Sequence, residues 1–327
     1  MEVSVKRFLF FLLFISVTAF PGSNFYDFDV VGGKILQNNR PPLRSMYGTA
    51  SPQDQKYHVG ILWARTEWLK AKAIMFDETT ILRIMMKSPM EDGNYTILQS
   101  DPCGYGIPPV KKFEGVSQYI THVSALVNGQ TVLDVYTSPN ISKHPQLSCR
   151  YYNIKDAKEM KFIIYDNNGL RKEAIFPFKK AEVASSVSFR PVHAKKPVPV
   201  NTNAFKAMSV PDAIKAVYPH FNHPTEGKIS IGVPRISSNS SAIPVTIMSD
   251  IDLESLAVFS SETPYPTIAV FANPVVGLIN YKFKIKIYNR TTGNYTITAI
   301  GKDRNGKFYK TVIKGKYALG SDCCGCV

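Results

Sequence analysis

Residues 281–288 read Tyr-Lys-Phe-Lys-Ile-Lys-Ile-Tyr, and this stretch decides the fold expected for the second half of the chain. Successive side chains of a β-strand point to opposite faces of a sheet, so the aromatic and aliphatic residues share one face. We therefore predict a strand that covers a hydrophobic core and displays Lys282, Lys284 and Lys286 on its other face. These lysines are candidates for an anion or partner patch, and a solvated lysine-rich sheet face explains them equally well.

Outward from this strand, short runs of β-favouring residues alternate with turn signals at intervals of about 8–12 residues, which is typical of an all-β sandwich. Asn128-Gly129 and Asn305-Gly306 predict hairpin turns, because both residue types tolerate positive φ. One short helix is expected from the cap at Ser209 to about Val217. Strands are predicted at 57–64, 80–86, 120–127, 131–136, 161–165, 171–178, 228–233, 243–248, 256–260, 267–271, 281–288, 294–302 and 307–317.

The chain is long enough for two domains. It has 327 residues, 44% of them hydrophobic, so each half can bury a core of its own. Between the halves, Pro191, Pro197 and Pro199 interrupt the strand pattern and indicate a linker. We expect two immunoglobulin-like β-sandwich domains in tandem with a flexible C-terminal cysteine tail. The predicted divisions are a leader at 20–70, sandwiches at 71–180 and 205–319, a linker at 181–204 and a tail at 320–327.

The first 19 residues differ from the rest. Lys6 and Arg7 precede an apolar run at 8–20, which is shorter than the roughly 20 residues that cross a bilayer. Together with the small residue Ala19, this predicts a secretory signal cut near Ala19, with an uncleaved anchor as the alternative. We expect a periplasmic or otherwise exported protein without membrane insertion after the signal is removed.

The charge is strongly basic, with a formal net charge of +14. Such an excess attracts anions and acidic partner surfaces. Export argues against nucleic acid as the partner, and no reading helix or base-stacking motif accompanies the charge. Residues 279–316 contain ten basic residues and a single acidic residue, Asp303. The basic residues are Lys282, Lys284, Lys286, Arg290, Lys302, Arg304, Lys307, Lys310, Lys314 and Lys316.

The cysteines are the most informative residues of the chain. Cys323, Cys324 and Cys326 fall within the last five residues, beyond the last expected strand, so a role as buried hydrophobes does not suit them. Cys103 and Cys149 lie in the first half, where an oxidising compartment allows a structural disulfide between them. Three terminal thiols leave one unpaired, which indicates a function for the tail.

Several motifs of the first half, at about 72–178, resemble the SoxZ family. Residues 88–93, Ser-Pro-Met-Glu-Asp-Gly, are similar to the family's HPMETG, with serine replacing histidine. Residues 141–145, Ile-Ser-Lys-His-Pro, are similar to ISKNP, and residues 166–169, Asp-Asn-Asn-Gly, to the DNxG turn. Any role of the family's histidine therefore does not carry over to Ser88.

The second half, at about 205–327, resembles the SoxY family. Residues 233–245 are similar to PxIAENGxxVPV and keep Asn239 and Pro244. Thr263-Pro264 with Ile268, Ala269 and Phe271 is similar to NPxPxIAxF. SoxY ends in GGCGG shortly after its last strand, and the tail Gly-Ser-Asp-Cys-Cys-Gly-Cys-Val aligns Cys324 with the carrier position.

The resemblance implies a fused SoxZ–SoxY sulfur carrier. Thiosulfate would be joined oxidatively to Cys324, with Cys326 and Cys323 as alternative attachment sites. The carrier would need no cofactor besides the sulfur on its cysteine, and the two halves would pair within the chain. Its partners would be the Sox enzymes, namely a joining c-type cytochrome, a sulfate-releasing hydrolase and a sulfane dehydrogenase. The chain itself would be no enzyme, and its six histidines form no evident catalytic constellation.

Two alternatives remain at this point. The Cys-Cys-Gly-Cys tail could bind a soft metal such as Cu(I), which thiolates select, while four-coordinate zinc lacks the ligands it needs. The chain could also be a SoxYZ-like carrier of another oxidative pathway.

Overall fold

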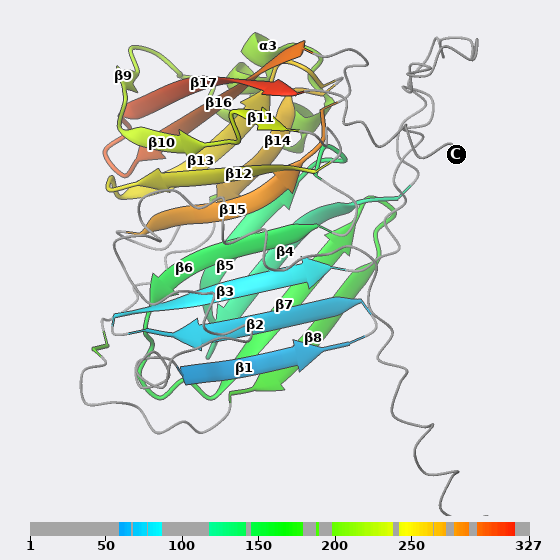
Figure 1. Ribbon diagram of the computed structural model, residues 1–327, viewed down its shortest axis with the longest axis vertical. Coiled ribbons are helices and arrows are strands. Elements are labelled where there is room, and N and C mark those ends of the chain that lie inside the picture. Colours follow the sequence, from blue (N-terminus) through cyan, green and yellow to red (C-terminus); the bar gives the residue numbers. More distant parts are fainter. Residues whose placement is uncertain are drawn as a thin grey trace, which may run out of the picture.

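The described residues fold mainly into β-strands. The computed structural model describes residues 59–66, 68–76, 78–86, 118–141, 145–178, 188–189, 198–237, 242–263, 265–272, 278–287 and 293–317. Within these ranges the all-β prediction is confirmed (Figure 1).

The described residues of the first half form eight strands, which lie in the lower part of Figure 1. They are β1 (Val59–Arg65), β2 (Leu69–Met75), β3 (Thr79–Met86), β4 (Ile120–Val127), β5 (Gln130–Thr137), β6 (Gln146–Tyr152), β7 (Glu159–Asp166) and β8 (Arg171–Pro177).

In the second half, the described part of the chain has two helices followed by nine strands, in the upper part of Figure 1. They are the 3₁₀-helix η4 (Thr202–Lys206), α3 (Val210–Val217), β9 (Thr225–Glu226), β10 (Ile229–Gly232), β11 (Ile236–Ser237), β12 (Ile243–Ser249), β13 (Leu253–Ser260), β14 (Thr267–Ala272), β15 (Ile279–Ile285), β16 (Gly293–Asp303) and β17 (Phe308–Tyr317).

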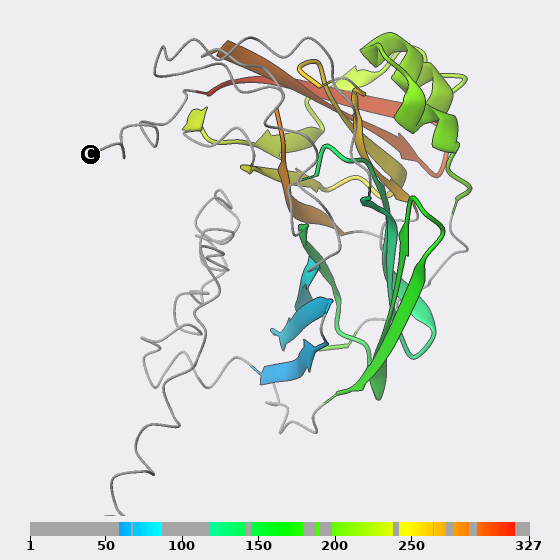
Figure 2. The ribbon, with the colours of Figure 1, turned by 90° about the vertical axis from the view of Figure 1, so that its right-hand side faces the viewer.

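Two large sheets face each other, as the edge-on view of Figure 2 shows. One has the strand order β1-β2-β3-β6-β15-β12-β10, and the other has the order β11-β17-β16-β13-β14-β5-β4-β7-β8, with β9 beside β17. Each sheet therefore contains strands from both halves of the chain. The two sandwiches expected in tandem are joined edge to edge in both layers.

The junction between the halves consists of two antiparallel strand pairs. In one sheet β5 pairs with β14, with Val135 opposite Phe271. In the other sheet β6 pairs with β15, with Cys149 opposite Tyr281. A bridge between Ile141 and Ile285 and a 2.7 Å hydrogen bond from the Lys286 N–H to the Asn140 carbonyl extend the second pair. At the junction, strands that would otherwise be sheet edges with unpaired backbone N–H and C=O groups thus form hydrogen bonds with each other.

One hydrophobic core runs through both halves. The buried cluster includes Leu82 and Phe162 from the first half together with Phe271 and Phe283 from the second. At the junction the rings of Phe271 and Tyr281 stack with centroids 3.9 Å apart. Because apolar burial is the main driving force of folding, the halves contribute to each other's stability.

The two helices cover the outer face of the β14-containing sheet in the second half, where Ala257, Phe259, Val270, Ile300 and Phe308 form a second core. The cap predicted for α3 is present, because the Ser209 hydroxyl accepts the Asp212 N–H at 3.2 Å. In Figure 2 the helices lie over this sheet above the junction.

Residues 225–237 close the upper end of the sandwich. β9 and β11 are two-residue strands that pair in parallel with β17, while β10 between them pairs with β12 of the other sheet. The segment thus links both sheets at their outer edge.

The predicted strands agree with the structure except at a few positions. The Asn128-Gly129 turn has the expected positive φ values of 47° and 78°. At the other predicted turn only Gly306 has a positive φ, and the Asp303 carboxylate accepts the Asn305 and Lys307 N–H groups instead. β1 corresponds to the strand predicted at 57–64 within the leader, whereas β2 and β6 were not predicted.

Candidate functional site

The predicted carrier cysteines Cys323, Cys324 and Cys326 lie outside the described residues. Cys103, the predicted disulfide partner of Cys149, lies outside them as well. The point from which the tail departs is described, because β17 ends at Tyr317. There β17 pairs with β16 on one side and with β11 on the other, where Ser237 stands opposite Tyr317. The ten residues that follow therefore begin at a strand end held by two neighbours.

The lysine row of β15 does not face solvent as expected. Lys282 is 8% exposed, Lys286 is 1% exposed and Lys284 is half-buried. Lys282 lies on β15, which has β12 and β6 as neighbours, and Lys286 lies one residue beyond the end of that strand. Each of the three lysines makes an interaction within the protein, as a buried charge requires. The expectation of an exposed row is therefore wrong for Lys282 and Lys286.

Cys149 is a free thiol in the core. It is 1% exposed, and its Sγ lies 3.9 Å from the Val132 carbonyl oxygen. Burial raises the pKa of this thiol, so the nucleophilic thiolate is disfavoured. In the structure Cys149 thus serves as a core residue at the junction of the halves.

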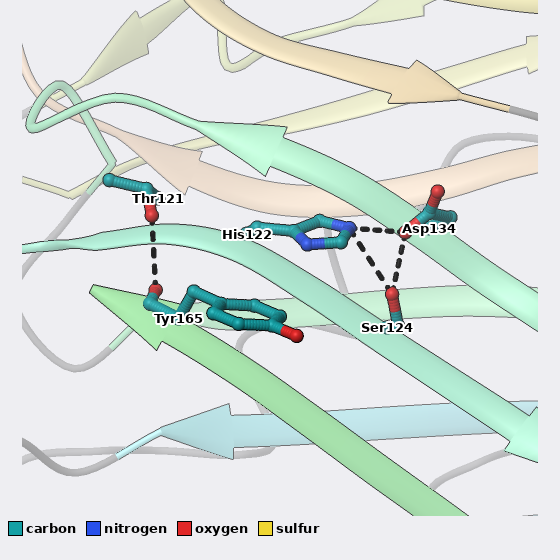
Figure 3. Close-up of polar contacts among 5 residues, drawn as sticks. All are labelled: Thr121, His122, Ser124, Asp134 and Tyr165. Carbon is teal, nitrogen blue, oxygen red and sulfur yellow. Dashed lines mark hydrogen bonds and ion pairs between the residues drawn. The ribbon is translucent and has the colours of Figure 1, made fainter. Parts of the chain in front are cut away.

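A polar cluster that the sequence did not reveal lies on the outer face of β4 and β5 (Figure 3). His122 Nε2 contacts the carboxylate of Asp134, which is 4% exposed. The Ser124 hydroxyl donates to the same carboxylate at 2.6 Å and lies 3.2 Å from His122 Nε2. The buried carboxylate is therefore satisfied by two donors.

This cluster has the residue types of a hydrolytic triad but not its arrangement. In such a triad one ring nitrogen of histidine contacts the serine and the other contacts the aspartate. Here both Ser124 and Asp134 approach Nε2, and the serine proton points to the carboxylate. No relay from serine through histidine to aspartate results, so the cluster fixes the ring of His122 instead.

The ring of His122 lies between two tyrosines. Tyr136 stacks on it with centroids 4.1 Å apart, and Tyr165 lies on the other side at 5.6 Å. Burial raises the pKa of Tyr136, and the Asp134 carboxylate raises it further, so the phenol stays neutral. The Arg171 guanidinium continues the row over Tyr165, at 6.0 Å.

Beside this row lies a cleft of about 640 Å³ at the junction of the halves. One wall comes from β4, β5 and β7, and the other comes from η4 of the second half. It can hold planar or polar groups against aromatic rings, and it exists only when the halves are paired. The lining residues include Tyr119, His122, Tyr136, Tyr165, Phe205 and Lys206.

Among the described residues, no group of three or more His, Cys, Asp or Glu side chains is placed to hold a metal ion. Within the same ranges, no helix is long and apolar enough to cross a membrane.

Comparison with known proteins agrees with the resemblance of the first half. The family model of "Sulphur oxidation protein SoxZ" matches residues 70–176. Among curated proteins no sequence matches the chain. The similar solved structures include the sulfur carrier protein SoxY from Chlorobium limicola f thiosulfatophilum, with 22% identity, coverage of 35% of this chain and 96% of that chain, and a TM-score of 0.30. They also include SGBP-B of the Bacteroides ovatus mixed-linkage glucan utilization locus, with 13% identity, coverage of 73% of this chain and 53% of that chain, and a TM-score of 0.16.

The matched segment runs from β2 through nearly all of β8, and hence over almost all strands that the first half contributes to the two sheets. The chain is therefore similar, over residues 70–176, to the sulphur oxidation protein SoxZ.

Proposed function

We propose that this protein is an exported sulfur carrier that holds thiosulfate-derived sulfur covalently on Cys324. The observation that carries the proposal is the SoxZ match at residues 70–176. The second half of the chain adds strands to both sheets of this matched segment. The second half has SoxY-like motifs and ends in the cysteine-bearing segment. A SoxZ-like and a SoxY-like half paired in one polypeptide would make a self-contained carrier.

The chemistry suits a thiol at the end of a chain. Cysteine thiolates attack oxidised sulfur and leave reversibly, as in thiol–disulfide exchange. Joining of thiosulfate to Cys324 would form a Cys–S–S–SO₃⁻ adduct and release one proton and two electrons, which the joining c-type cytochrome accepts. Hydrolysis by a second enzyme would then add water, release sulfate and one proton, and leave Cys–S–SH.

The carrier itself would not catalyse these steps. The cluster with the residue types of a catalytic triad lacks the geometry of a relay. The joining cytochrome, the sulfate-releasing hydrolase and the sulfane dehydrogenase would act on the tail in turn. A segment of ten residues after Tyr317 can extend roughly 33–36 Å, which is enough to enter a partner's cleft.

Intact-mass spectrometry tests the proposal. The full chain is purified without reductant, beside the variants Cys324→Ser, Cys326→Ser and Cys323→Ser. We expect masses of added sulfur or thiosulfate on the wild type and on the two control variants, and none on Cys324→Ser.

Two other outcomes would change the account. Adducts that persist in Cys324→Ser but disappear in Cys326→Ser would keep the function and move the attachment site. Stoichiometric copper on the purified protein without any sulfur adduct would contradict the carrier role and favour the metal-handling alternative, since clustered thiolates select Cu(I).

A further inference from the structure

A mixed basic and apolar surface lies beside the root of the tail. It consists of Val312, Lys314 and Lys316 on β17 and Ile236 on β11, and we call it the tail-root face. Val312 is 44% exposed and Ile236 is 61% exposed, and both lysines are exposed as well. Large exposed apolar side chains beside cations are characteristic of contact surfaces between proteins.

The strand register places these four side chains on one side of the sheet. Alternate residues of β17 share a face, so Val312, Lys314 and Lys316 point the same way. Ile236 stands opposite Lys316 in the parallel pair of β11 and β17, which puts it on that side too. The opposite side of β17 faces the core, where Tyr309 is buried and Ile313 packs against the main hydrophobic cluster.

The two lysines differ from other cations of the same sheet. Lys302 forms an ion pair with Glu254 at 3.2 Å, and Arg304 forms one with Asp252 at 2.9 Å. Within the described part of the chain, Lys314 and Lys316 have no acidic partner within ion-pair distance. Their charge is therefore available to a molecule outside this chain.

We propose that the tail-root face is the docking surface for an acidic, partly apolar patch on a partner protein. The identity of that partner rests on the proposed function, since it would be a sulfur-oxidation enzyme that receives the tail. Cys324 follows Lys316 by eight residues, which span at most about 26–29 Å. A partner held at this face therefore has the thiol within reach of its own active site.

A protein surface fits this face better than a small anion. Alternate residues of a strand are separated by roughly 6.6–6.8 Å, so the two lysines spread their charge along the strand. Two exposed apolar side chains flank them, which an inorganic anion would not use. An extended acidic surface with an apolar centre can contact all four residues at once.

The test is charge reversal on the full chain. The variant Lys314→Glu/Lys316→Glu is compared with wild type and with Lys155→Glu/Lys158→Glu, which changes the net charge equally at exposed positions elsewhere. The probe is a purified sulfate-releasing hydrolase of a Sox system, with binding measured at low and high salt. We expect the first variant to bind about tenfold more weakly or worse at low salt, with a flatter salt dependence, and the control to bind like wild type.

A second variant tests the apolar part. Ile236→Thr/Val312→Thr keeps the charges and suits β-strands, so we expect weaker binding with an unchanged salt dependence. Equal weakening by both charge reversals would show a general charge effect and overturn the proposal. Unchanged binding of the Lys314/Lys316 variant, or no binding by wild type, would overturn it as well.

Two further measurements distinguish a protein partner from a lipid surface, and a failure of the docking face from a failure of the carrier function. Vesicles of phosphatidylglycerol and phosphatidylcholine serve as a second probe, and an effect on vesicle binding without one on the hydrolase would overturn the proposal in favour of a lipid surface. The mass of the tail adduct is measured on the same samples. Loss of the adduct with binding intact would contradict the carrier function but not the docking face.

Discussion

Cys149 and Tyr281 stand opposite each other in the register of β6 and β15, at the line where the two halves of the chain meet. Both are buried, and the Tyr281 ring stacks on Phe271, which itself belongs to the other sheet. The contact surface between the halves is therefore part of the protein's core and not a patch on the outside of two finished domains. The paired halves should behave as one folding unit.

Truncation of Phe271 should destabilise the whole chain. Its ring is 1% exposed and contacts residues of the shared core, so Phe271→Ala should lower the free energy of unfolding by about 3–5 kcal/mol. Urea unfolding followed by fluorescence should show one transition at a lower midpoint. Ile175→Ala, at a side chain that is 50% exposed, is the control and should change little. Two separate transitions in the wild type would contradict the shared core.

Cleavage of the linker should leave the halves together. A protease site is introduced near Lys195, within the predicted linker at 181–204. Because strand pairs in both sheets and one core join the halves, the cut fragments should co-elute at micromolar concentration. In the uncut chain, the linker makes the pairing of the halves intramolecular, at an effective concentration on the order of millimolar. Fragments that separate without denaturant would show that the pairing is too weak to matter.

Much of the fold was readable from local patterns. The alternation at 281–288 correctly placed Tyr281, Phe283 and Ile285 in the core, and the Ser209 cap correctly began α3. The partners of each strand were not readable, because pairing depends on contacts across the whole chain. The same alternation gave the wrong exposure for Lys282, on a strand with a neighbour on each side, and for Lys286, just beyond the end of that strand.

The polar cluster was hidden by a β-bulge. A two-residue turn at Asn128-Gly129 sets Val127 opposite Gln130, and that register alone would place Ser124 opposite Leu133. The structure shifts by one residue between Ala125 and Leu126, so that Ser124 faces Asp134 and His122 faces Tyr136. A one-residue shift moves every later side chain to a new neighbour, and the sequence has no clear signal for it.

The buried Cys149 thiol should make stability fall at alkaline pH. Burial raises its pKa above the ordinary value of 9.0, so above about pH 9 the unfolded chain releases a proton that the folded chain keeps. The free energy of unfolding should then decrease by about 1.4 kcal/mol per pH unit for this group. Cys149→Ala should remove that part of the slope, as measured by urea unfolding between pH 8 and about pH 10.5.

Tyr281 provides the comparison for this prediction. Burial raises its pKa well above 10.0, so its contribution begins about one pH unit later than that of Cys149. Tyr281→Phe should therefore leave the slope between pH 9 and 10 unchanged. A wild-type stability that is flat across this range, or rapid alkylation of Cys149 in the native protein, would contradict the buried thiol.

The cluster around Asp134 should act in stability and not in hydrolysis. His122→Phe retains a ring between the tyrosines but removes a donor from the buried carboxylate, so it should cost on the order of 3 kcal/mol. Adding Asp134→Leu should recover part of this loss, which a double-mutant cycle of urea midpoints measures. Hydrolysis of p-nitrophenyl acetate should be the same in wild type and Ser124→Ala. A loss of hydrolysis in Ser124→Ala would reveal a nucleophile.

The central claim, that the tail carries sulfur on Cys324, is tested most directly at the level of one peptide. Lys316 is the last basic residue, so trypsin releases Tyr317–Val327 with all three tail cysteines. The protein is incubated with thiosulfate, a joining c-type cytochrome and an electron acceptor, digested without reductant and analysed by fragmentation mass spectrometry. The account predicts the mass of one thiosulfate on this peptide, located at Cys324 and absent when thiosulfate is omitted. An unmodified Tyr317–Val327 peptide, under conditions in which the same cytochrome loads a SoxY protein, would contradict it.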